Sequence, residues 1–411
     1  MEITKNVMNG KKNTSTRRQP SRWLPGFAIL AATLLAIASC SKTDMQPVLP
    51  EVTLPDTLPS LAVIDDSMAS FMERFDIPGA SIAVVKDGKL VYAKGYGYAD
   101  QSAGELVDTS SLFRIASLSK FVTAVGIMTL IEDGLLTMDD TVFGSGGVLG
   151  NDFFSGTYPA FVEDITVRHL LHHENGGWGN SSADPAFAQP TLDVNQLISW
   201  AIANRPLTVQ PGTAHDYSNL GFQILGRIIE KVSGDDYVDY IQTHVLAPAG
   251  ITNMQIGGTK LAEKKPGEVT YYGQSGQNPY GYANGVISRL ESCGGWIASA
   301  IDLMRLMVHA DGFTTVPDIL DPATINLMST PSANSNYACG VRISSIYGNW
   351  FHGGSLSGTR TWMVRTYHGY SWAILLNSRS TASNFTSHLD ARLVWPAVNN
   401  ASTPWPTNDL F

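Results

Sequence analysis

A serine and a lysine three residues apart, Ser117 and Lys120, are of the types that nucleophilic catalysis needs. Apolar residues recur at helical spacing after them, so both side chains are expected on one face of a helix. A serine hydroxyl is a weak nucleophile until a base takes its proton, and an amine one turn away can do so. In a first helical turn, free backbone N–H groups can also stabilise an oxyanion. The pair predicts acyl transfer through a nucleophilic serine.

A second motif, Tyr217-Ser218-Asn219, adds a phenol and an amide. Tyr217 is another candidate base, because a nearby ammonium favours its phenolate, and it is a candidate proton donor to the leaving group. Asn219 would orient the substrate amide and Lys120 by hydrogen bonds. We therefore assign Lys120 and Tyr217 to catalysis, and the sequence leaves open which of the two is the primary base.

Three segments together carry a family resemblance. Residues 113–124 (FRIASLSKFVTA) resemble the nucleophile helix of the class C β-lactamase, DD-peptidase and esterase family of serine hydrolases. Residues 211–230, which include the tyrosine motif, are similar to that family's second signature. Residues 293–303 are similar to its Gly-Gly segment before a helix. The resemblance runs from about residue 61 to about residue 394.

The resemblance also implies substrate-binding roles for a third motif, His352-Gly353-Gly354, and for the residue after it. The two glycines permit close backbone approach. By the resemblance, the backbone N–H groups of Ser355 and Ser117 form the oxyanion hole. These residues, together with Asn219, are our predicted substrate-binding set.

His352 departs from the β-lactamase pattern, in which this place usually holds lysine, whereas peptidases and esterases of the group often carry histidine. A fixed ammonium attracts a substrate carboxylate at ordinary pH, but a histidine is mostly neutral above its pKa. We therefore expect short-chain esters to be better substrates than β-lactams, and carboxylated substrates to be hydrolysed better as the pH falls. Alternatively, Arg360 supplies the missing charge.

The pattern of expected elements predicts an α+β fold. A helix at 61–75 precedes two strands at 80–85 and 89–96, which flank an Asp87-Gly88 turn. A mainly helical region of about 115–290 follows, and strands return near the end of the chain. This order implies one antiparallel sheet that is flanked by helices and closed by both termini, with an inserted helical subdomain. The resemblance implies the same β-lactamase/transpeptidase-like architecture. The other expected elements are helices at 166–171, 193–203, 219–232, 237–244, 298–310 and 385–394, and strands at 337–346, 350–352, 359–366 and 371–376.

The first 40 residues resemble an export signal. Six basic residues precede an apolar run at 27–38 that is too short for a permanent membrane helix. The run ends in Leu35-Ala36-Ile37-Ala38-Ser39-Cys40, which resembles a bacterial lipobox, so Cys40 is the predicted lipidated first residue of the mature chain. Residues 41–60 are expected to form a flexible tether, and 61–398 the hydrolase domain. The expected location is the bacterial cell envelope, on a membrane and facing the periplasm or the cell surface.

Charge and composition limit the partners. Residues 1–40 hold six basic and one acidic residue, so their removal changes the formal net charge from −9 to −14. That balance argues against nucleic acid and against anionic lipid surfaces, and leaves the lipid anchor as the attachment. We expect a monomer that acts on a small-molecule or peptidoglycan-like substrate without a cofactor.

The remaining cysteines raise the question of a disulfide, and a histidine-rich segment raises the question of a metal site. Cys293 and Cys339 are an even pair in an oxidising compartment, so a disulfide between them is a candidate, with two buried thiols as the alternative. The segment 169–174 holds three histidines and a glutamate, but it matches no zinc-protease pattern and resembles a structural loop of the family; we assign no metal site. Trp178 and Asn180 are candidates for lining the cleft.

The leading functional prediction is a serine hydrolase that works through an acyl-enzyme on an ester or a peptide-like amide, of esterase or D-amino-acid peptidase type. A true class C-like β-lactamase is the alternative. A non-catalytic penicillin-binding or ligand-binding module is a third candidate. It is less favoured because Ser117, Lys120, Tyr217 and Asn219 are all present. The absence of a Gly-x-Ser-x-Gly elbow disfavours an α/β-hydrolase.

Overall fold

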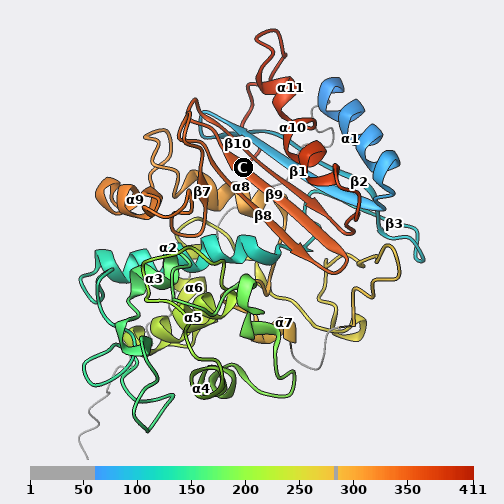
Figure 1. Cartoon of the computed structure of the whole chain (residues 1–411). Coiled ribbons are helices and arrows are strands. Elements are labelled where there is room, and N and C mark those ends of the chain that lie inside the picture. The colour runs from blue at the N-terminus through green and yellow to red at the C-terminus, as the bar shows by residue number, and fades with distance from the viewer. Residues whose placement is uncertain (1–60, 282–285) are drawn as a thin grey trace, which may run out of the picture. The chain divides into compact units, whose positions relative to one another are not determined.

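The computed structural model of the chain describes residues 61–281 and 286–411. A seven-stranded antiparallel sheet joins the two ends of this part of the chain (Figure 1). Its strands are β1 (Gly79–Lys86), β2 (Lys89–Asp100), β3 (Glu105–Leu106), β7 (Arg342–Ile343), β8 (Trp350–Leu356), β9 (Thr359–Arg365) and β10 (Tyr370–Leu376). Their order is β3-β2-β1-β10-β9-β8-β7, with Ala80 opposite Leu376 at the central pairing of β1 and β10. The predicted sheet closed by both termini is confirmed.

Strands β1 and β2 form the hairpin that the Asp87-Gly88 turn predicts. Asp87 and Gly88 have φ values of 50° and 78°, and two consecutive positive φ values match the right-handed twist of the flanking strands. Ile82 and Ala83 are both fully buried but belong to different hydrophobic cores. Strand β1 is therefore covered on both faces, and its sequence is apolar almost throughout.

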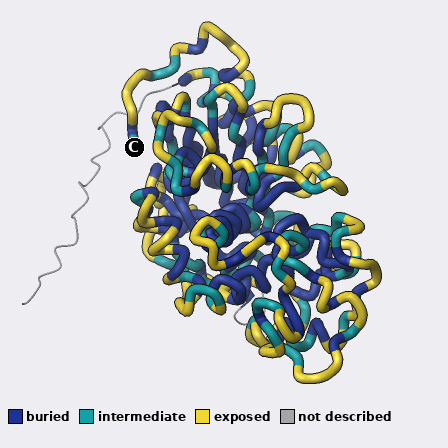
Figure 2. Tube along the Cα trace, turned by 90° about the vertical axis from the view of Figure 1, so that its left-hand side faces the viewer, coloured by how far each residue is buried: buried dark blue, intermediate teal, exposed yellow. Residues whose placement is uncertain are grey.

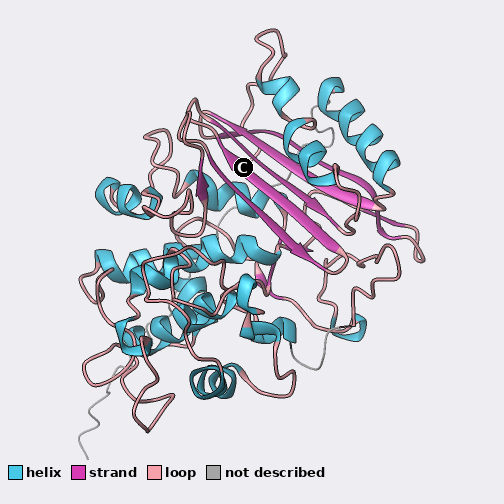
Figure 3. Cartoon of the chain, in the orientation of Figure 1, coloured by secondary structure: helices cyan, strands magenta, loops and turns pink. Residues whose placement is uncertain are grey.

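Helices cover the two faces of the sheet (Figure 3). One face packs against α1 (Ala62–Phe75), α10 (Phe385–Ala391) and α11 (Trp395–Val398). Helix α1 buries Ile64, Met68, Phe71 and Phe75, whose spacing of four, three and four residues places them on one side. The other face packs against α8 (Ala300–Val308). The predicted mixed α+β fold with flanking helices is thus confirmed.

A mainly helical region lies between two short strands, β4 (Phe113–Arg114) and β6 (Trp296–Ala298), which pair with each other. Strand β6 also pairs with β5 (Gln255–Ile256) and so lies in the middle of this three-stranded sheet. Its helices are α2 (Ser119–Glu132), α3 (Val167–Leu171), α4 (Val194–Asn204), α5 (Asn219–Ser233), α6 (Tyr237–Ile241) and α7 (Val286–Arg289). Helix α2 is buried around almost its whole circumference, and Figure 2 shows such buried segments running through the interior. A helix that is apolar all round needs this surrounding protein.

Several elements differ from the prediction in their extent. The expected strand 337–346 is reduced to β7, because a turn at Gly340, with φ of 76°, packs closely against α2. A Cβ at Gly340 would lie 2.7 Å from the Lys120 carbonyl oxygen. Conversely, β8 continues four residues beyond the expected end at His352. The expected last helix ends earlier, at Ala391, and the helix expected at 237–244 changes after Ile241 into a π-helical turn, Gln242–Leu246.

Several sequence predictions fall outside the described residues. They are the export signal, the lipidated Cys40 and the tether at 41–60. Within the described part of the chain, no helix is long and apolar enough to cross a membrane.

Candidate active site

Ser117 lies in a 3₁₀ turn, Ala116–Leu118, immediately before α2 rather than in its first α-helical turn. Ala116 has a φ of 49°, in the left-handed region that a residue with a Cβ rarely adopts. On the other side, Gly354 of β8 leaves no room for a side chain, because an added Cβ would collide with the Ile115 carbonyl oxygen. The strained turn and the glycine together hold Ser117 against the edge of the large sheet.

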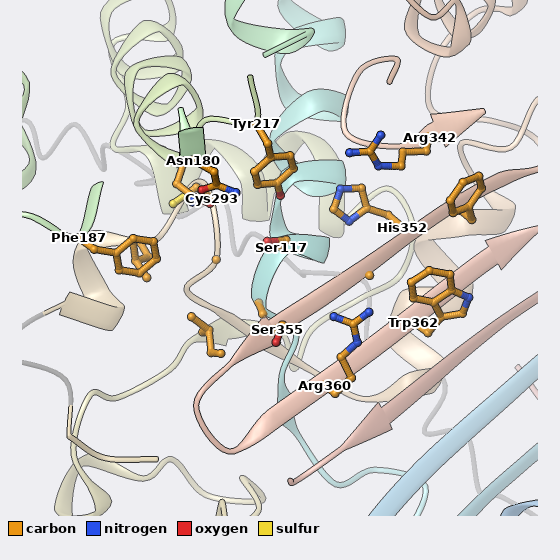
Figure 4. A pocket seen from close by; sticks show the side chains of 17 residues that line it. Ser117, Asn180, Phe187, Tyr217, Cys293, Arg342, His352, Ser355, Arg360 and Trp362 are labelled. Atoms are coloured by element: carbon orange, nitrogen blue, oxygen red, sulfur yellow. The ribbon is translucent and has the colours of Figure 1, made fainter. Parts of the chain in front are cut away.

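The serine faces a cavity of about 440 Å³ between the helical region and β8 (Figure 4). The cavity brings together most of the predicted site residues from three separate parts of the chain. Its lining includes Ser117, Tyr217, Asn219, His352, Gly353 and Ser355. Asn180 also lines the cavity, as predicted, and Phe187, Leu356 and Trp362 add apolar surface. The residues predicted from three motifs are therefore gathered around one hydroxyl.

Lys120 is fully buried beneath this hydroxyl. Its Nζ lies 3.5 Å from Ser117 Oγ and donates to Asn219 Oδ1 and to the Cys293 carbonyl oxygen, both at 2.7 Å. The two shorter bonds fix the amine, and they leave one of its tetrahedral directions for the serine. An amine at this place can accept the hydroxyl proton once the 3.5 Å separation shortens to hydrogen-bond distance, as catalytic contacts commonly do when substrate binds.

Tyr217 also lies close to the lysine amine. Its ring centroid is 4.9 Å from Lys120 Nζ, and its hydroxyl is buried and has no hydrogen-bond partner among the described residues. A buried hydroxyl without a partner is uncommon in folded proteins and calls for an explanation. An incoming substrate or leaving group at the cavity would supply the missing partner.

The charge state of His352 differs from the one that we expected. It is 4% exposed, and its Nε2 lies 3.2 Å from the Tyr337 hydroxyl. Burial, together with the positive charges of Lys120 and Arg342, lowers the pKa of His352 to about 3. The imidazole therefore stays neutral from alkaline pH down to well below pH 5. The expectation that it charges in mild acid and then attracts a substrate carboxylate is wrong.

Arginines supply positive charge instead. Arg342 and Arg360 line the cavity, and no carboxylate side chain is among the described lining residues. The Arg360 Nε is buried and lacks a partner in the described structure, while the guanidinium lies 5.6 Å from the Trp362 ring centroid. Arg379 lies behind them and donates to Ser355 Oγ at 2.9 Å. Arg360 was the sequence alternative; Arg342 was missed, because only the packing of β7 beside β8 brings it to the site.

Asp184 is a further residue that the sequence did not reveal. This carboxylate accepts hydrogen bonds from the backbone and side chain of Asn219 and from the Leu220 N–H. Burial raises its pKa, while these bonds and the Lys120 charge act in the opposite direction. The available signal was local: an aspartate before Pro185 is typical of a helix N-cap, and its side chain does accept from the Ala186 N–H.

The structure decides two open candidates among the neighbouring residues. Trp178 does not line the cavity; it is buried, and its indole N–H donates to the Arg205 carbonyl oxygen at 2.7 Å. The candidate disulfide is not formed, since Cys293 and Cys339 are both free. Their surroundings differ: Cys293 lines the cavity that Ser117 faces, whereas the Cys339 sulfur lies 3.7 Å from His172 Nε2. Burial raises the pKa of each thiol to about 12.

The histidine-rich segment has structural contacts. His169 Nδ1 accepts from the Thr166 N–H in a helix capping box, and His173 Nδ1 accepts from the Ser218 N–H behind the tyrosine motif. Glu174 accepts from the Asn334 side chain. Within residues 61–281 and 286–411, no group of three or more His, Cys, Asp or Glu side chains could hold a metal ion.

Comparison with known proteins shows the family of the chain. Residues 64–394 match the Beta-lactamase family, and the chain belongs to that family. The chain is 32% identical over 206 residues to Penicillin-binding protein 4* of Bacillus subtilis, a match that covers 48% of this chain and 42% of that protein. The chain thus spans less than two thirds of this curated relative's length.

Two solved structures share the fold. The octameric penicillin-binding protein homologue from Pyrococcus abyssi has a TM-score of 0.67 and 25% identity, over 82% of this chain and 76% of that one. The D-amino acid amidase from Ochrobactrum anthropi has a TM-score of 0.65 and 20% identity, over 83% of this chain and 98% of that one. The likeness to the amidase concerns the fold.

Proposed function

We propose that the protein is a serine hydrolase that forms an acyl-enzyme at Ser117. The observation that carries the proposal is the placement of Lys120 Nζ, which two short hydrogen bonds fix 3.5 Å from Ser117 Oγ. Ser117 in turn lines a substrate-sized cavity. The Tyr217 hydroxyl, which has no hydrogen-bond partner in the described structure, is a proton donor near the same amine. Family membership supports the same chemistry.

The proposed reaction has two steps. Ser117 Oγ attacks the substrate carbonyl carbon while Lys120 or Tyr217 accepts its proton, and the Tyr217 hydroxyl protonates the departing alcohol or amine. Water then attacks the acyl-enzyme, and the same groups act in reverse. In both steps the N–H groups of Ser117 and Ser355 would stabilise the oxyanion.

The proposed substrate is an ester or a peptide-like amide. Phe187, Leu356 and Trp362 offer apolar surface for an acyl or side-chain group, and the two lining arginines suit a carboxylate. A D-amino-acid amide or peptide combines these features, and the fold likeness to a D-amino acid amidase is compatible with it. A peptidoglycan-like fragment is the natural substrate of this kind in a cell envelope.

A β-lactamase is the second candidate, and a specific observation favours it. We expected weak β-lactam hydrolysis because His352 replaces a lysine, yet Arg342 and Arg360 provide positive charge at the same cavity. A penicillin or cephalosporin carboxylate therefore has partners. We expected esters to be preferred over β-lactams because His352 supplies no fixed charge, and with these arginines at the cavity that argument no longer holds.

Substrate profiling tests both candidates. The purified chain from residue 41 is assayed with p-nitrophenyl butyrate, nitrocefin and a D-Ala-D-Ala peptide. Turnover of the ester or the peptide supports the leading proposal, and a preference for nitrocefin by orders of magnitude supports the β-lactamase. Binding of penicillin without turnover of any of these would leave the non-catalytic module as the explanation and overturn the proposal.

Arg360→Ala is expected to discriminate between charged and neutral substrates. A hydrogen bond to a charged group contributes about 1.5–3 kcal/mol, so kcat/KM for nitrocefin should fall about 10–100-fold. The value for p-nitrophenyl butyrate, which has no carboxylate, should change less than about twofold. Steady-state kinetics of both substrates measures the effect, and Arg392→Ala, on the exposed surface, is the control. An equal loss on both substrates would contradict a role in carboxylate recognition.

We further propose that the protein is anchored to a bacterial membrane through a lipid on Cys40. Cys40→Ser is expected to abolish metabolic labelling with palmitate and to leave the protein soluble or unprocessed, because a short apolar signal cannot by itself provide a stable anchor. Fractionation of cells that express either form measures the change. Membrane association that is unchanged in this variant would point to another means of attachment.

A further inference from the structure

Asp184 lies next to Asn219 and Leu220, at the start of α5. It is 9% exposed and is not among the cavity-lining residues. One carboxylate oxygen accepts from the Asn219 backbone N–H and, at 3.0 Å, from Asn219 Nδ2. The other accepts from the N–H groups of Ala186 at 2.9 Å and Leu220 at 3.3 Å. Four donors therefore hold this carboxylate in place.

This contact determines the orientation of the Asn219 amide. An ionised carboxylate only accepts hydrogen bonds, so the amide must present its NH₂ group to Asp184. Its oxygen then points the other way, toward Lys120 Nζ, at 2.7 Å. A flipped amide would place its NH₂ group against the lysine amine and its oxygen against the Asp184 carboxylate, and Lys120 would lose one of the two bonds that fix it.

Asp184 also balances charge. Lys120 is fully buried, and no carboxylate lies within 4.0 Å of it in the described chain. A buried ammonium needs a compensating charge or a lowered proton affinity. Asp184 is a buried carboxylate one hydrogen-bonded side chain away, so it can stabilise the positive charge that the lysine acquires when it accepts the serine proton.

We propose that Asp184 is a positioning residue of the catalytic site: through Asn219 it holds Lys120 in the orientation that removes the Ser117 proton. The inference rests on the proposed serine hydrolase function. It extends the catalytic arrangement to a series of four side chains in contact, Asp184, Asn219, Lys120 and Ser117. Asp184 itself touches neither the substrate nor the reacting atoms.

The first test is Asp184→Asn, which preserves the size of the side chain but removes the charge and two acceptor sites. We expect kcat for p-nitrophenyl butyrate to fall about 10–100-fold, in line with the effect of a small misplacement of a catalytic group, with KM changed less than about twofold. The rate at which a fluorophosphonate labels Ser117 should fall by the same factor. An unchanged kcat in a folded variant would overturn the inference.

A matched control separates positioning from loss of a buried helix-capping carboxylate. Asp302 is 8% exposed and accepts from the Ser299 N–H and hydroxyl at the start of α8. Asp302→Asn therefore removes a comparable carboxylate away from the site, and kcat should stay within about twofold of the wild type at 25 °C. Thermal unfolding of both variants checks the fold. If Asp184→Asn does not fold, Asp184→Ser, which keeps an oxygen acceptor for the α5 N-terminus, replaces it throughout.

The decisive measurement is a double-mutant cycle with Asn219→Ala. Because Asp184 is proposed to act through the Asn219 side chain, Asp184→Asn should cause no further loss of kcat once that side chain is gone. Losses that multiply in the double variant would show that the two residues act independently and would overturn the inference. A wild-type protein that fluorophosphonate does not label would instead overturn the proposed function itself, so the two failures are distinguishable.

Discussion

Ser117→Ala is expected to abolish covalent labelling of the protein by a fluorophosphonate and to lower kcat by roughly 10⁴–10⁶-fold, the scale at which a nucleophile that acts as a unit with its base is lost. The physical reason is that Ser117 Oγ is the hydroxyl that Lys120 Nζ approaches in the cavity. The strained Ala116 before it and Gly354 beside it hold that hydroxyl in place. Intact-protein mass spectrometry and ester hydrolysis measure the two effects.

Ser119→Ala is the matched control. Ser119 is buried two residues further on, and its hydroxyl accepts from the Trp296 N–H at 3.3 Å, away from the cavity lining. Its loss should leave the labelling stoichiometry unchanged. Peptide mapping that finds the label on any serine other than Ser117 would refute the central assignment.

Lys120→Met should give the second large effect, a fall in kcat of about 10²–10⁴-fold, the usual contribution of a positioned general base. Methionine keeps most of the buried stem and removes only the amine that contacts Ser117, Asn219 and the Cys293 carbonyl. KM for p-nitrophenyl butyrate should change little, because the amine lies below the serine and handles a proton in the transition state.

Pre-steady-state kinetics can assign the affected step. If Lys120 is the base for acylation, the burst of p-nitrophenol should become slow in Lys120→Met and the acyl-enzyme should not accumulate. The same experiment with Tyr217→Phe, which keeps the ring but removes the unpartnered hydroxyl, shows which group is the primary base. Near-normal turnover in either variant would remove that residue from the proposed mechanism.

The parts of the fold that the sequence predicts well depend on local patterns. Helix α1 follows from apolar residues spaced by three and four, and the β1–β2 hairpin follows from the Asp87-Gly88 turn. The expected strand 337–346 fails for the opposite reason. Its residues have strand-like composition, but the turn at Gly340 packs against α2, and sequence alone contains no record of that distant contact.

The same division applies to the site. Ser117, Lys120 and Tyr217 were predictable because their spacing within short motifs reflects the chemistry directly. Asp184 was not, because its partner lies 35 residues further on and the contact depends on how two loops fold back. The neutral state of His352 was also beyond sequence reasoning, since burial and the charges of Lys120 and Arg342 produce it.

The pairing of β1 with β10 has a consequence for how the protein is made. Ala80 pairs with Leu376 at the centre of the sheet, so the ribosome must synthesise nearly the whole chain before this core can close. Contacts of such large sequence separation form slowly, and a growing chain that lacks them stays incompletely folded. For a chain that crosses a membrane, as proposed here, this delay keeps the polypeptide open enough for transport. On that proposal, Ser117 would reach its place beside β8 only after export.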